Sequence, residues 1–129
     1  DLPSINDAIL ACEALRQLGP EWVICTSAWQ FEEWLHNIAV GPHGAVQVRV
    51  PFVSDKNVVP KGTGDAFTAI LLGHYLDHGD IPAALSWASA ALHGLIQGSI
   101  DRYADELAVI SDRDQITSPN CIFPVERLS

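Results

Sequence analysis

The sequence from Gly62 to Leu72 reads GTGDAFTAILL, and it is the most informative stretch of the chain about fold and function. Its two glycines allow a tight turn and leave room for a ligand beside the backbone. The apolar residues that follow occupy nearly every side, which predicts a helix from Asp65 to about His78 that is buried all round. The first amides of such a helix lack helical partners, and the helix dipole favours negative charge there. The stretch therefore predicts a helix start that faces an anion such as a phosphate.

Asp65 stands at this helix start. As a bystander its carboxylate would repel a phosphate, but it is useful if it accepts a proton from a hydroxyl that attacks the phosphoryl group. The alternative is a simple glycine turn in which Asp65 stabilises the helix by roughly a few tenths of a kcal/mol. The predicted hairpin and loop before the motif favour the phosphate interpretation, because α/β folds bind ligands at sheet edges.

The first part of the chain predicts a helix and then a strand. Ser4 and Asp7 form a capping pattern, and apolar residues follow at helical spacing until Gly19. Residues 22–26 are a short apolar run, which after a helix indicates a buried parallel strand. Together they form one unit of an α/β domain.

Two further strands are predicted at residues 34–40 and 45–53, joined as a hairpin by the turn-forming sequence GPHG. Residues 54–61 form the loop that leads to the glycine motif. After that motif's helix, Asp80 is expected to cap a second helix. A shorter helix at about 103–117 and a final strand within 121–125 complete the chain.

The composition excludes several classes of function. Seven Lys and Arg against 16 Asp and Glu give a net charge of 7 − 16 = −9. This charge argues against nucleic acid and anionic membranes, which need a basic surface. No apolar run approaches the ~20 residues of a membrane span, and no signal peptide is visible. We therefore expect a cytoplasmic protein with no nucleic-acid or membrane partner.

The three cysteines, Cys12, Cys25 and Cys121, are odd in number and widely spaced. Neither a zinc site nor a disulfide framework is expected, and reduced thiols are the simplest interpretation. The chain contains no Met and begins with Asp1, from which we expect a fragment or a cleaved chain.

The glycine motif resembles the second signature of the ribokinase-like superfamily, and its GTGD form is similar to that of pyridoxal kinases. Three further segments resemble the same family: 23–27, 90–96 and 106–119. The resemblance spans residues 4–126 and about the C-terminal half of the family's domain. It implies that residues 1–129 are the C-terminal part of a single ribokinase-like kinase domain. The implied fold is α/β, with a mostly parallel central sheet and helices on both faces.

The resemblance also implies ATP-dependent phosphorylation of the 5′-hydroxymethyl group of pyridoxal, pyridoxine or pyridoxamine, in vitamin B6 salvage. Asp65 matches the catalytic base of the family. Gly62, Thr63 and Gly64, with the amide of Asp65, match its anion hole. The family's Mg²⁺ accompanies ATP, and its members form homodimers, so both are expected here.

The same resemblance assigns a nucleotide site. Thr26 and Ser27 match contacts to the ATP phosphates, and Thr26 also matches a ligand of a monovalent cation such as K⁺. Leu92 and Ile96 correspond to the adenine pocket. Lys61 departs from the family, which tends to have an apolar residue there, and is either a phosphate-binding cation or a solvated loop lysine.

Substrate identity stays open at this point, because the family's vitamin-ring contacts, lid and magnesium-linked acid would lie before Asp1. The alternatives are a sister kinase for hydroxymethylpyrimidine or a sugar, and a non-catalytic fragment that binds nucleotide. His74 and His78 have helical spacing for a metal but no third ligand nearby. The four tryptophans are expected to pack in a core or interface rather than to form a stacking surface.

Overall fold

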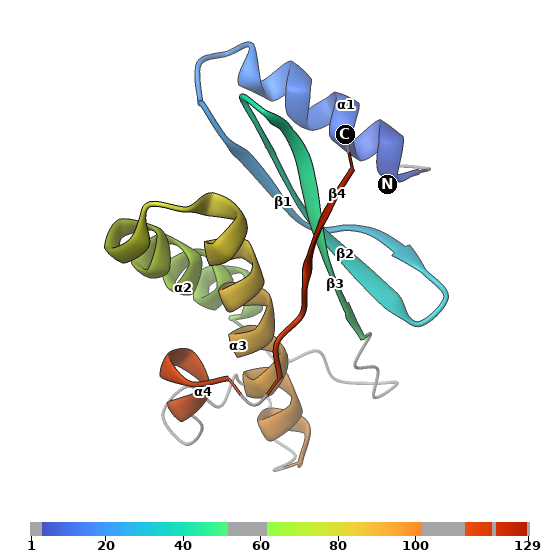
Figure 1. Cartoon of the computed structure of the whole chain (residues 1–129). Helices are drawn as coiled ribbons and strands as arrows, with labels where there is room; N and C mark the ends of the chain where they lie inside the picture. Colours follow the sequence, from blue (N-terminus) through green and yellow to red (C-terminus); the bar gives the residue numbers. More distant parts are fainter. Residues whose placement is uncertain (1–3, 52–61, 102–112, 120, 129) are drawn as a thin grey trace.

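The computed structural model describes residues 4–51, 62–101, 113–119 and 121–128, and of residues 99–101 it describes the backbone only. Helices and strands follow one another as shown in Figure 1. In chain order they are α1 (Ile5–Arg16), β1 (Val23–Phe31), β2 (Trp34–Gly41), β3 (Gly44–Pro51), α2 (Thr63–His78), α3 (Ile81–Asp101), α4 (Asp114–Thr117) and β4 (Val125–Arg127). None of the helices in the described ranges is long and apolar enough to cross a membrane.

Helix α1 starts as its sequence predicts. The hydroxyl of Ser4 accepts a hydrogen bond from the amide of Asp7 at 3.2 Å and donates to its carboxylate at 2.7 Å. Ser4 itself is extended, with φ −157° and ψ 166°, as an N-cap residue should be. The capping pattern read from the sequence is therefore confirmed.

The four strands form one sheet in the order β1-β2-β3-β4, and every pairing among them is antiparallel. The expectation of a parallel strand at 22–26 is wrong for this sheet. Strand β1 runs on to Phe31 and turns through Glu32 and Glu33 into β2, and so short a connection joins only antiparallel strands. The mostly parallel sheet expected from the resemblance is therefore not seen in this part of the chain.

The predicted hairpin is confirmed over the described residues, whereas the last two positions of its second strand, 52 and 53, and the predicted loop 54–61 with Lys61 lie outside them. Gly41 pairs with Gly44 across the turn, where Gly44 has a φ of 117° that suits glycine. A side chain at Gly41 would collide with the ring of Trp22, whose atoms lie 2.5 Å from the position of a Cβ. The final strand forms slightly later than expected, at Val125–Arg127, and pairs with β3.

Helices cover both faces of the sheet, as expected. Neighbouring residues of β2 point to opposite sides: Ile38 and Val40 pack with α1, whereas Ala39 packs with α2 and α3. Figure 1 shows α1 on its own and α2 beside α3 as a pair. The sheet is therefore the middle of three layers.

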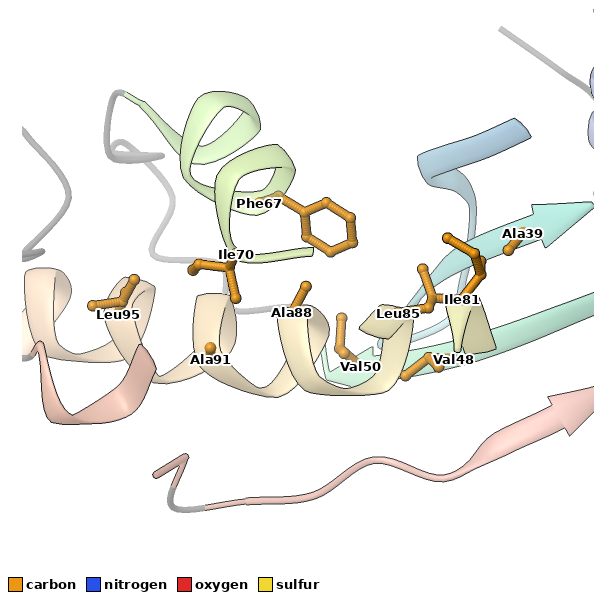
Figure 2. Packing of buried hydrophobic residues seen from close by; sticks show 10 residues of the cluster. All are labelled: Ala39, Val48, Val50, Phe67, Ile70, Ile81, Leu85, Ala88, Ala91 and Leu95. Carbon is orange, nitrogen blue, oxygen red and sulfur yellow. The ribbon is translucent and has the colours of Figure 1, made fainter. Parts of the chain in front are cut away.

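The larger core lies between α2, α3 and the sheet. Figure 2 shows Phe67 and Ile70 of α2 directed towards Ala88 and Leu85 of α3, with Val50 of the sheet beside them. Leu85 and Leu95 are fully buried. In this core α2 packs against α3, and α3 in turn packs on β2 and β3.

The expectation that α2 is buried all round is wrong. Leu72 is 50% exposed and Leu76 is 73% exposed. Both lie on the side of α2 away from the core residues Phe67 and Ile70, and the described part of the chain does not cover them. The apolar sequence of α2 therefore exceeds what the described residues bury.

The C-terminal elements rest on α3. Asp80 caps α3 as predicted, since its carboxylate accepts from the amide of Ala83 at 3.0 Å. The helix predicted at 103–117 falls largely on residues 102–112, which lie outside the described residues, and its end appears as α4. The indole of Trp87 donates to the carbonyl of Ile116 at 2.8 Å and holds α4 against α3.

Candidate functional site

Helix α2 begins with an open turn at Gly62. This residue has φ 91° and ψ 10°, a left-handed conformation that glycine adopts without steric cost. Its carbonyl accepts the first helical hydrogen bond, from the amide of Ala66 at 3.0 Å, so the preceding amides come before the helical ladder. Gly62 offers no side chain to cap them. The helix starts at Thr63, earlier than the Asp65 expected from the sequence, and presents backbone N–H groups at its end.

The described residues leave this helix start exposed. Gly62, Gly64 and Asp65 are exposed, and a Cβ added at Gly64 would meet no atom within 4 Å. The hydroxyl of Thr68 is engaged, because it donates to the carbonyl of Gly64 at 2.9 Å. An anion can therefore approach the positive end of the helix dipole, next to a carboxylate in the first turn that can accept a proton.

Thr26 and Ser27 lie in a bulge of β1. The pairing of β1 with β2 shifts between Cys25 and Trp29, so that three residues of β1 lie opposite Asn37 alone. Ser27 has a φ of 49°, which is uncommon for a residue other than glycine. Both hydroxyl-bearing residues are exposed. Bulges redirect side chains and are frequent beside active sites, which suits the role expected for this pair.

Asn37 holds the bulge, although no sequence motif points to this residue. Its side-chain oxygen accepts from the amide of Ser27 at 2.8 Å, and its side-chain nitrogen donates to the hydroxyl of Ser89 at 3.1 Å. Asn37 and Ser89 are 6% and 2% exposed. The signal that could have found Asn37 is its place between Leu35 and Ala39 on one face of the predicted strand 34–40, where a buried amide must find partners.

Leu92 and Ile96 lie on α3, three and seven residues after Ser89, and therefore on the same side of the helix. Leu92 is half-buried and packs against the larger core. Ile96 is also half-buried but is not part of that core cluster. The two adenine-pocket candidates thus share one helix face with the residue that anchors Asn37.

The larger core brings the pieces of the predicted site together. Ile24, which precedes Thr26 in β1, packs on the same cluster as Leu92 of α3. Phe67, just after Asp65 in α2, is a buried member of that cluster. The motif, the bulge and the α3 face therefore border one rigid body of packed side chains.

The rings of His74 and His78 stack at 4.2 Å, and the described residues contain no group of three or more His, Cys, Asp or Glu that could hold a metal. The three cysteines are free. Burial raises the pKa of Cys12 from 9.0 to about 11, with nearby Cys25 adding to the effect, so Cys12 stays a neutral thiol.

With this geometry in view, the comparisons with known proteins point to one group of enzymes. No protein-family model matches the sequence. The chain is 30% identical over 132 residues to the pyridoxal kinase PdxY of Corynebacterium diphtheriae, covering 100% of this chain and 44% of that protein. This chain is homologous to pyridoxal kinases. It is also 26% identical to PdxY of Rubrobacter xylanophilus, covering 45% of that protein. The chain thus spans less than half the length of the curated relatives it matches.

Solved structures agree on the fold. The pyridoxal kinase from Leishmania donovani, solved with ADP and pyridoxine, superposes with a TM-score of 0.83 at 23% identity, over 98% of this chain and 45% of that one. A protein from Bacteroides thetaiotaomicron assigned as a phosphomethylpyrimidine kinase gives a TM-score of 0.81 at 21% identity, over 97% and 44%. The α/β arrangement described above is therefore part of a larger kinase fold in both.

Proposed function

We propose that this chain is the C-terminal part of an ATP-dependent kinase that phosphorylates the 5′-hydroxymethyl group of a B6 vitamer: pyridoxal, pyridoxine or pyridoxamine. The observation that carries the proposal is the uncapped start of α2, where exposed backbone amides and the exposed Asp65 lie together. The homology to pyridoxal kinases over the whole chain supports the choice of substrate class. The solved relative that holds ADP and pyridoxine has the same fold in this region.

The proposed chemistry is a direct phosphoryl transfer. Asp65 takes the proton from the substrate's 5′-hydroxyl as its oxygen bonds to the γ-phosphorus of ATP. The bond from that phosphorus to the β–γ bridging oxygen breaks, and ADP leaves. The amides of Gly62, Thr63, Gly64 and Asp65 donate to the γ-phosphoryl oxygens as negative charge develops on them.

ATP would lie between the α2 start and the bulge of β1. Thr26 and Ser27 would contact its phosphates, and Leu92 and Ile96 would line the adenine pocket on α3. The described residues form no protein cage for Mg²⁺, so the ion would enter with the nucleotide and neutralise phosphate charge. Thr26 would give one oxygen ligand to a monovalent cation such as K⁺. No step here depends on either ion.

The rest of the proposal follows the relatives. The kinase would act in vitamin B6 salvage in the cytoplasm, as a homodimer, with ATP and the vitamer as its partners. Parallel strands would come from the portion of the kinase fold that these 129 residues do not include, next to the outer strand β1. That portion would also supply the vitamin-ring contacts.

A kinase assay on the full-length polypeptide, with pyridoxal and ATP, tests the proposal against Asp65→Asn. The substitution should lower the phosphorylation rate by about 10² or more, because a positioned general base contributes ~10²–10⁴. ADP affinity should stay within about threefold, since the shape of the helix start is kept and one negative charge is lost. A rate within about threefold of wild type rejects Asp65 as the base.

A second candidate is a sister kinase, favoured by the structural similarity to the Bacteroides protein. It predicts that hydroxymethylpyrimidine or a sugar, and not pyridoxal, is phosphorylated in the same assay. A non-catalytic nucleotide-binding fragment is a third, favoured by the exposed Leu72 and Leu76 on α2. It predicts ADP binding with no phosphorylation of any of these alcohols by the full-length polypeptide.

A further inference from the structure

The bulge of β1 leaves Ser27 without an ordinary strand partner. Between the pairs Cys25–Ile38 and Trp29–His36, the residues of β1 outnumber those of β2, so backbone groups cannot match one to one. The amide of Ser27 is instead bound by the side chain of Asn37 at 2.8 Å. That bond accompanies the left-handed φ of 49°, a conformation that persists only where the surroundings enforce it.

Burial of the Asn37 amide at this position carries a desolvation cost. It lies on the α3 side of β2, between Leu35 and Ala39, which both pack with the larger core. A leucine there would add apolar burial, whereas a buried amide is tolerated only when it is hydrogen-bonded. Asn37 meets that condition through both ends of its side chain, towards Ser27 and towards Ser89.

The bridge links two parts of the chain that are far apart in sequence. Asn37 and Ser89 are 52 residues apart, and their hydrogen bond is 3.1 Å long and buried. Ser89 lies on the same face of α3 as Leu92, which comes three residues later in the helix. One side chain therefore sets the exposed hydroxyls of the bulge relative to the face proposed to hold the adenine.

We propose that Asn37 is a positioning residue, which holds Thr26 and Ser27 in register with α3 so that their hydroxyls bind the phosphates of a nucleotide. The inference rests on the proposed nucleotide site but assigns a role that the sequence motifs do not contain. Asn37 touches no substrate, so its effect passes through Ser27. It acts on phosphate binding and leaves adenine binding alone.

The test compares ADP with adenosine, which lacks phosphates, on wild type and Asn37→Leu. Loss of the bridge should raise the Kd of ADP about tenfold, the scale of one hydrogen bond to a charged partner, and leave the Kd of adenosine unchanged. Hydrogen exchange at the amide of Ser27 should become faster. In the full-length polypeptide, the KM for ATP should rise more than kcat falls.

Gln47→Leu is the matched control. It makes the same kind of change in the same sheet, at a residue that bonds to His36 at 2.7 Å, and should leave both Kd values unchanged. Ser89→Ala removes only the α3 end of the bridge and serves if Asn37→Leu does not fold. It should raise the Kd of ADP by roughly threefold, as expected for one neutral hydrogen bond.

Three results would overturn the inference. Equal weakening of ADP and adenosine by the Asn37 and Ser89 variants would make the bridge a general support of the fold. No change in either Kd would remove any link to the nucleotide. If wild type binds neither ADP nor adenosine, the proposed function itself fails, and that failure is visible before any variant is made.

Discussion

Helices α1 and α2 differ in whether a side chain caps the amides of their first turns. In α1, the hydroxyl of Ser4 accepts from the first turn at 3.2 Å, and Asp7 closes the arrangement. In α2, the corresponding position is Gly62, which has no side chain and a left-handed backbone. Helix α3 resembles α1 in this respect, because the carboxylate of Asp80 caps its first turn. Among the described residues, the starts of α1 and α3 carry side-chain caps, whereas the start of α2 carries none.

The difference in stability between the two kinds of helix start is small. A side-chain cap contributes about 1 kcal/mol relative to alanine, and glycine at the same position costs only roughly a few tenths of a kcal/mol. The uncapped start at Gly62 therefore gives up little stability. It is understandable where an anion takes the place of the cap.

The largest effect on this comparison is expected from Gly64→Ala. A Cβ at this position meets no protein atom, so the substitution should stabilise the helix by about 0.5–1 kcal/mol. The same Cβ would stand where a phosphate approaches the backbone, and the Kd of ADP should rise at least about tenfold as charge-assisted hydrogen bonds lengthen. Isothermal titration and denaturant unfolding measure the two effects separately.

Gly73→Ala is the control for that experiment. Gly73 also lies in α2 with open space around it, far along the helix from the start. It should give the gain in stability without the loss of affinity. If both variants bind ADP like wild type, the open start of α2 is not a phosphate site.

A smaller effect is expected from Ser4→Ala at the closed start of α1. The loss of its cap should lower the free energy of unfolding by about 1 kcal/mol, while the Kd of ADP stays unchanged. Denaturant unfolding with ADP titration checks both values. Asp80→Ala should behave alike at α3, and a change in nucleotide affinity from Ser4→Ala would contradict the distinction between the two kinds of helix start.

The smallest effect is the pH dependence of stability that His93 causes. It sets the pH range in which the unfolding measurements can be compared directly. His93 of α3 lies edge-on to Phe123, and burial lowers its pKa from the ordinary 6.5. The unfolded chain therefore binds a proton more readily, so the contribution of His93 to stability is present above pH 6.5 and is lost as the pH falls below that value and through the lowered pKa of the folded chain. Unfolding of His93→Gln at a series of pH values should show a shallower decline than wild type. An identical slope would show that His93 does not titrate differently on folding.

Much of the fold could be predicted because its signals are local. Ser4 with Asp7, the turn at 41–44 and the cap at Asp80 each lie within a few residues of the structure they specify. The direction of β1 was missed because an apolar run of five residues does not reveal which neighbour it pairs with. That neighbour is set by the short turn after Phe31.

The candidate site divides in the same way. The open helix start followed from Gly62 and Gly64 alone, because backbone freedom and helix polarity are local properties. Asn37 could not be found by the same reasoning, since its meaning depends on Ser89, 52 residues away. The burial of α2 was overestimated because an apolar sequence shows how much surface a helix can bury, and not whether the described residues cover that surface.

The exposed leucines of α2 have a practical consequence for handling the chain. Leu72 and Leu76, together with the outer strand β1, offer apolar surface and a strand edge to other copies. The net charge of −9 works against such contacts through repulsion between copies. Salt shortens the range of that repulsion, to ~10 Å at 0.1 M. Ionic strength should therefore decide whether a concentrated sample stays dispersed or precipitates.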